Sequence, residues 1–427
     1  MNGLSSQPYK GTRDWYPEDK AVQNYIFSTW KRVVESFAYQ EYGAPLLEPL
    51  EVYAAKSGDE LANEQTYAFT DRGGREVAIR PEMTPTVSRM VAARRQELAY
   101  PARLFSIANF MRYERPQRGR EREFWQLNVD MFGADGVSAE AETLQLADEI
   151  MKGFGATNDM YEIRVNSREL IDEITRNYLG LDEQTAKALV RLIDRKNKMT
   201  EQVFSEAVSE LLGNQEKVQR LEALFAANGI DALPEQLADS EAAKRMRELF
   251  RLLRALNVTS TRFDVTLMRG LDYYTGTVFE VFDTDPENNR SLFGGGRYDG
   301  LVGMFGVEPV SAVGFAPGLT TTELFIRTHN LLPELSLGSA VYIVSVGDVI
   351  EESLKIAAEL RVAGVSVESD VTGRKLDKQL KSAVKKQATY VVFVGENEID
   401  SNSFKIKNLV SGEERTATRQ EIARVVA

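Results

Sequence analysis

The chain has 427 residues, of which 43% are hydrophobic and 27% are charged, and this favours two or three globular domains over a disordered or fibrous protein. It contains no cysteine, a single histidine, no apolar run long enough to span a membrane and no signal-peptide pattern, which excludes disulfides and thiolate-bound zinc and makes a cytoplasmic location the default expectation. Because the net charge is -12, any binding of nucleic acid requires local basic patches on an acidic body.

Residues 1–168 mix helical and strand-like patterns. Apolar residues recur at helical spacing from Gln23 to Phe37, whereas 76–79 and 124–132 alternate as strands do. From 169 to 258, apolar residues recur three or four positions apart among many charges and strand-like alternation is missing. This pattern predicts a helical unit inserted between two β-rich blocks.

β character returns in 259–328, at 262–267 and 277–282, and the segment Phe293–Asp299 is predicted to be a glycine-rich turn. Residues 329–338, with Pro333, are predicted to form a linker. In 339–427, strands and helices alternate, which predicts a small α/β domain with a mainly parallel sheet. The expected strands are 340–346, 365–368, 389–394 and 404–409, and the expected helices are 350–362 and 376–386.

Four clusters carry residues suited to chemistry. Residues 112–126 hold five arginines around a glycine-containing turn, fit either to grip phosphate oxygens or to form a solvated, salt-bridged hairpin. Residues 268–274 place an arginine and a glycine before two tyrosines, and 294–299 place three glycines before an arginine; each suits a pocket floor or an ordinary turn. In Arg80–Thr84, Glu82 and Thr84 would face the same side of a strand and could hold an ammonium group.

The order and combination of these clusters resemble histidyl-tRNA synthetases over nearly the whole chain. The opening 10–14 matches the start of that family, and Pro45–Glu51 stands where class II motif 1 builds the dimer interface. Residues 112–130 resemble motif 2, 269–274 and 294–299 resemble the two histidine signatures, and the last ~90 residues resemble the anticodon-binding domain shared by several class II enzymes.

The resemblance implies a class II fold, with an antiparallel catalytic sheet flanked by helices. The catalytic domain would comprise 1–168 (motifs 1 and 2) and 259–328 (histidine signatures and motif 3). Residues 169–258 would be the helical insertion, and 339–427 a C-terminal α/β anticodon-binding domain. The implied activity is that of a histidine–tRNA ligase: histidine and ATP form histidyl-adenylate, and the histidyl group then passes to the 3' end of histidine tRNA. The implied enzyme is a homodimer that uses ATP with Mg²⁺ and no zinc.

By similarity, Arg269 and Arg112 are the expected catalytic residues, stabilising the α-phosphate as charge develops. The remaining site residues divide by substrate. Histidine would be bound by Glu82, Thr84, Arg112, Gln126, Asp130, Arg269, Tyr273, Tyr274 and Tyr298, and ATP by Arg112, Glu114, Arg120 and Phe124. A basic helical face in the last domain would contact tRNA through Arg374, Lys378, Lys381 and Lys385.

The chain departs from the family pattern at two positions. Asp130 replaces a glutamate that many members carry; the shorter carboxylate still accepts a proton from an imidazole. Motif 3 usually reads Gly-Leu-Glu-Arg, and that arginine grips the γ-phosphate, but here Thr321 stands at the arginine position. Arg327, six residues further along a helix, would point elsewhere.

The missing arginine keeps a second hypothesis open. Catalytically inactive relatives of this family regulate ATP phosphoribosyltransferase, and they often lose ATP contacts while keeping the histidine pocket. The arginine-rich loop at 115–120 and the anticodon domain favour the ligase. A synthetase for another amino acid is disfavoured by the signature at 269–274.

Overall fold

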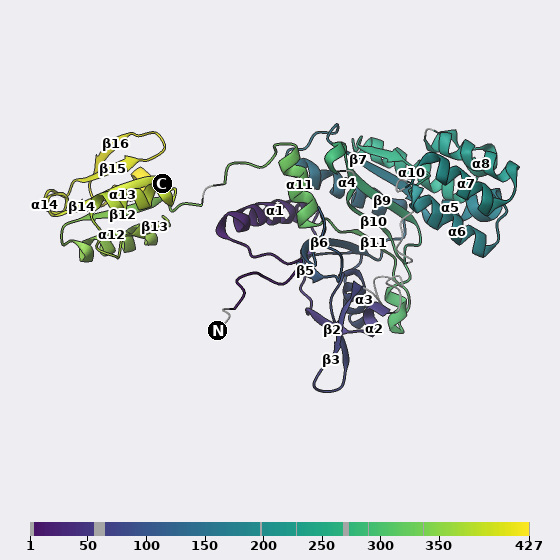
Figure 1. The fold of residues 1–427 in the computed structure, drawn as a ribbon, viewed down its shortest axis with the longest axis horizontal. Helices are drawn as coiled ribbons and strands as arrows, with labels where there is room; N and C mark the ends of the chain where they lie inside the picture. The colour runs from purple at the N-terminus through teal and green to yellow at the C-terminus, as the bar shows by residue number, and fades with distance from the viewer. Residues whose placement is uncertain are drawn as a thin grey trace. The chain divides into compact units, whose positions relative to one another are not determined.

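In the computed structural model, the described residues are 4–54, 65–196, 199–227, 229–267, 273–288, 290–335 and 337–426. They divide into two units, one formed by 1–14 and 22–332 and the other by 15–21 and 333–427. Each unit has its own sheet and core (Figure 1).

Two ten-residue strands form the centre of the larger unit. β5 (Ala102–Met111) and β6 (Glu123–Phe132) pair antiparallel along their full length, and their buried positions are largely apolar, as a sheet covered by helices requires. In the described residues the sheet has eight strands in the order β1-β5-β6-β11-β10-β9-β7-β8, parallel only at its two edge pairs. The other strands are β1 (Gln40–Glu41), β7 (Tyr161–Ser167), β8 (Thr261–Phe263), β9 (Thr277–Asp283), β10 (Ser291–Arg297) and β11 (Ala312–Phe315). The antiparallel sheet expected from the class II resemblance is confirmed.

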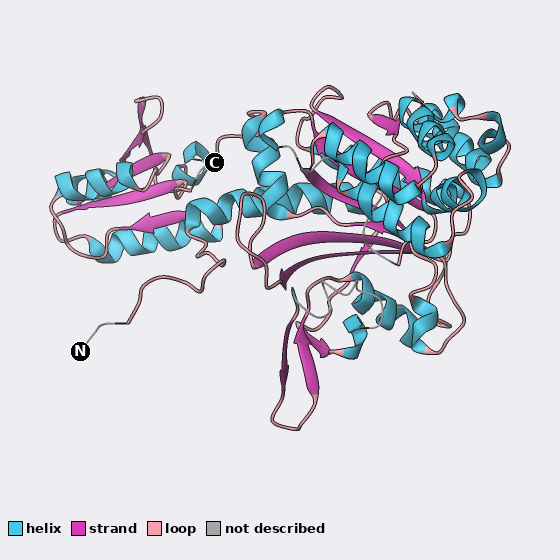
Figure 2. Ribbon diagram, turned by 45° about the vertical axis from the view of Figure 1, so that its right-hand side comes forward, coloured by secondary structure: helices cyan, strands magenta, loops and turns pink. Residues whose placement is uncertain are grey.

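Helices flank this sheet, as Figure 2 shows. α1 (Pro17–Ser36) buries an apolar stripe that includes Ile26, Trp30 and Val34, at helical spacing. α4 (Val137–Gly153) packs against β11, and α11 (Leu319–Thr328) packs against β6 and β10. A smaller sheet, β2-β4-β3, joins β2 (Leu47–Pro49), β4 (Glu76–Ile79) and β3 (Tyr67–Thr70), and is followed by α3 (Thr84–Ala93).

All the named elements between residues 168 and 255 are helices. Five of the helices begin at side chains that accept hydrogen bonds from otherwise unpaired backbone N–H groups: Ser167, Asp182, Thr200, Asn214 and Ser240. The helices are α5 (Arg168–Asp172), a π-helical segment (Glu173–Tyr178), α6 (Glu183–Asp194), α7 (Glu201–Leu212), α8 (Gln215–Ala226), α9 (Glu235–Ala238) and α10 (Glu241–Ala255).

The second unit contains a sheet in the order β13-β12-β14-β15-β16. Its elements are β12 (Val341–Val346), α12 (Ile350–Val362), β13 (Val367–Ser369), α13 (Leu376–Lys385), β14 (Tyr390–Gly395), α14 (Glu396–Ser401), β15 (Phe404–Asn408), β16 (Glu414–Ala417) and α15 (Ile422–Val426). The expectation of a mainly parallel sheet was wrong: β12 pairs in parallel with β13 and β14, but β14–β15 and β15–β16 are antiparallel. After β14 only α14 and a short turn intervene, too little chain for a crossover to a parallel strand.

Two local predictions in the larger unit were also wrong. The glycine-rich segment at 293–299 is not a turn, because most of it belongs to β10 in the middle of the sheet. A Cβ on Gly295 would lie 2.1 Å from the carbonyl oxygen of Gly314, so the glycines serve close approach of neighbouring strands. Thr84 begins helix α3 and does not continue a strand from Glu82, since the proline that follows it suits the first turn of a helix.

Candidate active site

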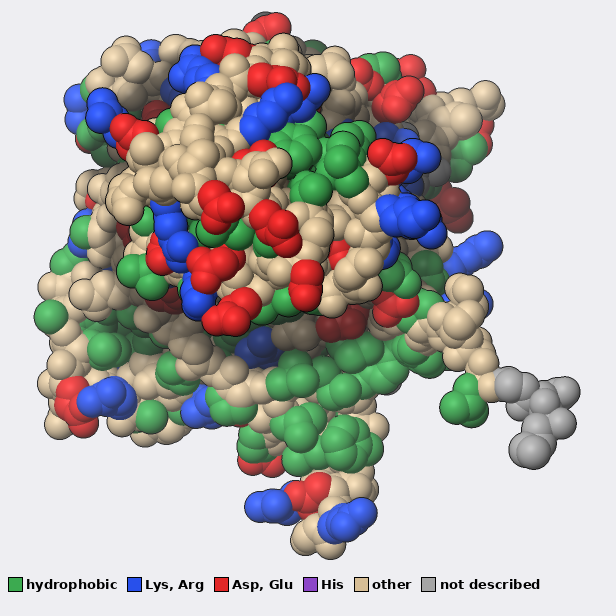
Figure 3. Space-filling model, turned by 90° about the vertical axis from the view of Figure 1, so that its left-hand side faces the viewer, with side chains coloured by type: hydrophobic (Ala, Val, Ile, Leu, Met, Phe, Trp, Pro, Cys, Tyr) green, Lys and Arg blue, Asp and Glu red, His purple; other side chains and the backbone are tan. Residues whose placement is uncertain are grey.

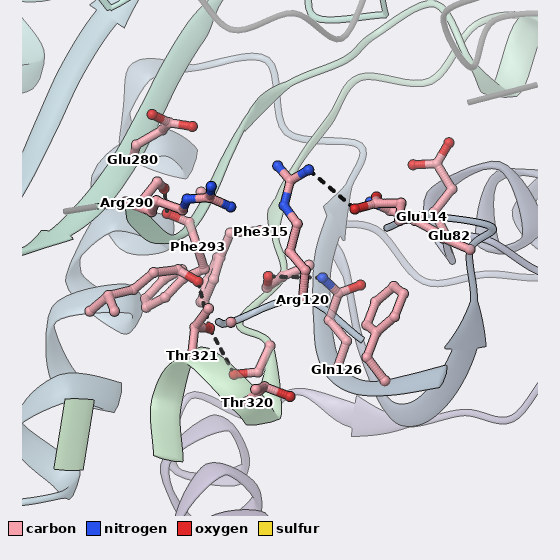
Figure 4. A pocket seen from close by; sticks show the side chains of 18 of the residues that line it. Glu82, Glu114, Arg120, Gln126, Glu280, Arg290, Phe293, Phe315, Thr320 and Thr321 are labelled. Carbon is pink, nitrogen blue, oxygen red and sulfur yellow. Dashed lines mark hydrogen bonds and ion pairs between the residues drawn. The ribbon is translucent and has the colours of Figure 1, made fainter. Parts of the chain in front are cut away.

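A cavity of about 1830 Å³ lies along the sheet of the larger unit. Its walls come from the loop between β5 and β6, the starts of α3 and α11, strands β9 to β11, and one side of α6. Figure 4 shows Glu114 and Arg120 on one side of this space and Arg290, Phe293 and Thr321 on the other. Most site residues predicted from the sequence line this single cavity: Glu82, Thr84, Arg112, Glu114, Arg120, Phe124, Gln126, Tyr273, Tyr274 and Tyr298.

Arg112 is fixed where β5 ends. Its Nε donates a hydrogen bond to the carbonyl oxygen of Pro81 at 2.9 Å, and its guanidinium carbon lies 5.2 Å from the ring centroid of Phe124 on β6. The backbone N–H of Arg112 also bonds the carbonyl oxygen of Arg122 at 2.8 Å, which closes the hairpin. These contacts use one edge of the guanidinium and leave a positioned cation on the cavity wall.

Two further arginines of the hairpin loop, Arg118 and Arg120, each lie near a carboxylate. Arg120 Nη1 lies 3.1 Å from Glu114 Oε2. Arg118 Nη2 lies 3.5 Å from Glu287 Oε2 and 3.2 Å from Asn288 Oδ1. The side chains of Arg118 and Arg120 are more than half exposed, so these ion pairs are weak and easily exchanged for another anion.

A buried carboxylate, Asp130, forms the deep end of the site. The hydroxyl of Tyr298 donates a hydrogen bond to Asp130 Oδ1, and both residues are at most 3% exposed. Asp130 Oδ2 has no hydrogen-bond partner among the described residues. Burial raises the pKa of Asp130 to about 7, although the Tyr298 hydrogen bond opposes this.

The neighbouring strand makes room for this carboxylate. Asp130 pairs with Gly314 across β6 and β11, and a Cβ on Gly314 would lie 2.5 Å from Asp130 Oδ1. Asp130 lies behind Tyr298 and, unlike Tyr298, is not one of the described residues that line the cavity. Tyr42, which the sequence did not single out, presents a buried hydroxyl without a partner among the described residues, and its pKa is raised well above its usual value by burial and by Asp130.

Three tyrosines connect the deep end to Glu82. The ring centroids of Tyr273 and Tyr298 are 5.9 Å apart, and those of Tyr273 and Tyr274 are 4.9 Å apart. The hydroxyl of Tyr273 lies 3.4 Å from Glu82 Oε2, and both side chains are buried. A buried carboxylate beside aromatic faces is suited to a small cation such as an ammonium group.

Gln126 and Thr321 are both tied to backbone carbonyl groups. Gln126 Nε2 donates to the carbonyl oxygen of Ala316 at 3.1 Å. Thr321 Oγ1 lies 2.8 Å from the carbonyl oxygen of Leu292 and 3.1 Å from that of Gly318. Arg327 pairs with Glu323 at 2.9 Å and is not among the described residues that line the cavity, which agrees with the prediction that it points elsewhere.

Arg269, the other expected catalytic residue, lies outside the described residues. The structure adds lining residues that the sequence did not single out. Lys187, Arg191 and Arg195 recur every four positions, a signal for one helix face that was available from the sequence. The additional charged residues that line the cavity are Arg168, Lys187, Arg191, Asp194, Arg195, Glu280, Glu287 and Arg290.

The basic face predicted in the second unit is only partly present. Lys378, Lys381 and Lys385 are exposed on α13, at spacings that place them on one side of the helix. Arg374 was wrongly included, because it precedes the helix and pairs with Asp370 at 2.6 Å.

The described residues contain no group of three or more metal-ligating side chains that could hold an ion. Within the same ranges, no helix combines the length and the apolar character needed to cross a membrane.

Comparison with known proteins identifies two family models in the chain. The histidyl-tRNA synthetase model matches residues 11–321, and the anticodon-binding-domain model matches residues 340–427. The histidine–tRNA ligase of Leptospira biflexa serovar Patoc is 41% identical over 423 residues, which cover 98% of this chain and 96% of that protein. The corresponding enzyme of Haloarcula marismortui is 37% identical over 413 residues, with 95% and 94% covered.

Solved structures have a similar fold. A crystal structure of histidyl-tRNA synthetase from Nostoc sp. PCC 7120 matches with a TM-score of 0.85 at 24% identity over 99% of both chains. A structure from Bacillus halodurans C, described as an ATP phosphoribosyltransferase regulatory subunit/histidyl-tRNA synthetase, matches with a TM-score of 0.77 at 25% identity, covering 92% of this chain and 99% of that one. The matched family models and the full-length relatives show that this chain belongs to the histidyl-tRNA synthetase family.

Proposed function

We propose that this chain is an active histidine–tRNA ligase, which converts histidine and ATP to histidyl-adenylate and pyrophosphate and transfers the histidyl group to the 3' end of histidine tRNA. The observation that carries the proposal is that one cavity extends from buried tyrosines, of which Tyr298 is hydrogen-bonded to the buried Asp130, to an arginine-rich opening. The first suits an uncharged, hydrogen-bonding side chain, and the second suits a polyphosphate.

At the deep end, Asp130 and Tyr298 would bind the imidazole ring, with Tyr274 beside it. Each ring nitrogen needs a hydrogen-bond partner once it is buried. Oδ2 of Asp130, which has no partner among the described residues, could accept a hydrogen bond from the ring. Asp130 does not line the empty cavity, so this role requires the Tyr298 ring to shift slightly when histidine binds.

Near the middle of the cavity, Glu82, Thr84 and Tyr273 would hold the α-amino group, since Glu82 is a buried carboxylate already bonded to Tyr273. Gln126 lies on β6 and also lines the cavity, so it would contact the same end of the substrate. The amino acid would then present its carboxylate toward Arg112.

Arg112 would bring the substrate carboxylate and the α-phosphate together. Phe124 would support the adenine ring and Glu114 would accept a hydrogen bond from its amino group, while Arg120 moves from Glu114 to the phosphates. The carboxylate oxygen bonds to the α-phosphorus and pyrophosphate leaves, so negative charge develops where Arg112 and, by family resemblance, Arg269 stabilise it.

Mg²⁺ would arrive with ATP and neutralise part of the phosphate charge. The described residues offer no cluster of metal ligands, so we assign the ion to the phosphate oxygens and assign no protein ligand to it. The chain has no cysteine, and we propose no zinc site.

RNA binding is assigned to the parts of the chain outside the catalytic sheet. We propose residues 1–168 and 259–328 as the catalytic domain, 169–258 as an insertion that faces the acceptor end of tRNA, and 339–427 as the anticodon-binding domain. The exposed lysines on α13 and the basic side of α6 supply the local positive charge that phosphates require. We propose a cytoplasmic location, where tRNA is charged for protein synthesis.

We also propose a homodimer. Three apolar side chains near the β2-β4-β3 sheet are exposed: Leu46 before β2 (43%), Leu47 at the start of β2 (47%) and Phe69 on β3 (47%). Figure 3 shows apolar side chains gathered at the base of the β3–β4 hairpin, which projects at the bottom of the view. Apolar patches of this kind mark interfaces. Light scattering at micromolar concentration should give twice the chain mass, and a monomer in active fractions would contradict the proposal.

A second candidate function, regulation of ATP phosphoribosyltransferase without catalysis, is favoured by the uncharged Thr321 and by the description of the Bacillus halodurans C structure. Amino-acid-dependent ATP–pyrophosphate exchange separates the two. The ligase predicts exchange with histidine and with none of the other nineteen amino acids, whereas a regulator predicts histidine binding without any exchange.

A further inference from the structure

Arg290 is an exposed arginine at the cavity wall, immediately before β10. Its Nη2 donates a hydrogen bond to Gln117 Oε1 at 3.1 Å, a neutral partner on the loop between β5 and β6. Among the described residues no carboxylate forms an ion pair with Arg290, whereas Arg118 and Arg120 each have one. Figure 4 shows the Arg290 guanidinium turned into the open space of the cavity, on the same wall as Phe293 and Thr321.

Thr321 fixes the strand that carries Arg290. Its hydroxyl reaches the carbonyl oxygen of Leu292 at 2.8 Å, two residues after Arg290. The pairing of β10 with β9 is irregular at this point, shifting between Ser291 and Phe293, and such irregularities re-aim the adjacent side chain. Thr321 therefore anchors the first turn of α11 to the irregular start of β10.

Arg290 and Thr321 both border the arginine-rich loop. Gln117 bonds Arg290, and Gly119 lies against Thr321, whose Cγ2 would be 3.8 Å from a Cβ on that glycine. Arg118 and Arg120 flank Gly119 in the chain. A polyphosphate held by the loop would thus meet Thr321 and Arg290 at the same end of the cavity.

We infer that Arg290 binds the β- and γ-phosphates of ATP and thereby supplies the positive charge that the Thr321 position lacks. The inference rests on the proposed ligase function and names a residue for it that the sequence analysis did not consider. Because the Arg290 guanidinium has no carboxylate partner among the described residues, it can bind an anion without first breaking an ion pair. Its planar N–H donors can bond two phosphate oxygens at once. Thr321 acts as a positioning residue, through its bond to Leu292.

The test is kinetic and uses the full-length protein. In histidine-dependent exchange, R290Q should raise the KM for ATP and for pyrophosphate about tenfold or more, as expected for loss of one charged contact, with a smaller change in kcat. Affinity for a sulfamoyl analogue of histidyl-adenylate, which has no β- or γ-phosphate, should stay within about twofold. Because Arg290 is exposed, folding should be unaffected, as a thermal melt will show.

The matched control is R254Q, which removes an exposed arginine at the end of α10 that does not line the cavity; its KM values should match those of the unaltered protein. In the double variant R290Q/T321R, an arginine at the family's usual position should restore most of the lost affinity for pyrophosphate. Failure of that restoration would overturn the claim that the two positions serve the same phosphates.

Two further outcomes would separate the inference from the function beneath it. An unchanged KM for pyrophosphate in R290Q, or an equal loss of affinity for the sulfamoyl analogue, would overturn the role of Arg290 while leaving the ligase intact. Absence of histidine-dependent exchange in the unaltered protein would overturn the ligase function itself.

Discussion

The two ends of the cavity are built on opposite physical plans. At the deep end, Asp130, Tyr298 and Tyr273 are 3%, 2% and 4% exposed and are held by side-chain hydrogen bonds and ring contacts. At the open end, Arg118 and Arg120 have side chains that are 56% and 54% exposed, each paired loosely with a carboxylate. One end is buried and held by internal hydrogen bonds, whereas the other is exposed and its ion pairs are easily exchanged.

The difference shows which end discriminates and which end attracts. A buried hydrogen-bonding group left without its partner costs about 1–3 kcal/mol, so the deep end can reject amino acids that fail to satisfy Asp130. Exposed arginines attract any polyphosphate, and their contribution lies in neutralising charge during the reaction. Selectivity for histidine should therefore depend on the buried end and the rate on the arginines.

The largest expected effect follows from removing the positioned cation between the two ends. R112Q should lower the rate of histidine-dependent exchange by on the order of 10²–10³-fold, because a charged contact to the reacting phosphate is lost. Histidine binding measured by calorimetry should weaken far less. An R112Q protein with near-normal exchange would remove Arg112 from the chemistry.

A smaller and differently placed effect is expected at the buried end. Y298F deletes the hydroxyl that donates to Asp130 and should raise the KM for histidine by about tenfold, from a hydrogen-bond loss of roughly 1–2 kcal/mol. The KM for ATP should remain within about twofold. Equal increases in both KM values would erase the division between the two ends.

Burial of Asp130 also predicts a pH dependence of stability. The folded protein keeps the proton of Asp130 up to about pH 7, whereas the unfolded chain loses it near pH 4, so the stability that this group contributes falls as pH rises between those values. D130N removes the titration, so its melting temperature relative to the unaltered protein should be higher at pH 8 than at pH 5, by roughly 2 °C. The same difference at both pH values would show that Asp130 is already ionised in the fold.

The smallest effect is expected in the second unit, on α13. Changing Lys378, Lys381 and Lys385 to glutamine should raise the KM for tRNA several-fold and lower the salt dependence of aminoacylation by about two to three contacts. Exchange without tRNA should not change. K355Q on α12 of the same domain is the control, since that lysine is paired with Glu351 and Glu352. Unaltered salt dependence in the triple variant would exclude this face from RNA binding.

Residues that occur in short sequence clusters were predicted better than residues that join the site from elsewhere in the chain. Most residues proposed to bind histidine and adenine were predicted from motifs, because those side chains occur in short, ordered clusters, and the structure brings nearly all of them to one cavity. Tyr42 and Arg290 were missed because each is distant in the chain from the cluster it joins, and only strand pairing brings them there. Arg374 was misplaced because helical spacing was extended past the residue where α13 begins.

The same limits applied to the fold. Helices with strong apolar periodicity were predicted to within a few residues, as at α12, which spans the expected residues 350–362. The glycine-rich strand β10 was mistaken for a turn, because a run of glycines looks the same in the sequence whether it permits close strand contact or a bend. The direction of β15 could have been predicted, because the expected strands 389–394 and 404–409 leave too short a connection for a parallel crossover. Strand β16 was not among the expected elements.

The central claim is that one cavity joins histidine at its buried end to ATP at its arginine-lined end. Single-turnover mixing of the unaltered protein with labelled histidine and excess ATP and Mg²⁺, without tRNA, tests it most directly. The account predicts close to one equivalent of bound histidyl-adenylate per active site, formed together with one equivalent of pyrophosphate; added pyrophosphate should return the adenylate to histidine and ATP. Normal histidine binding with no adenylate formed would contradict the account and favour the regulatory function.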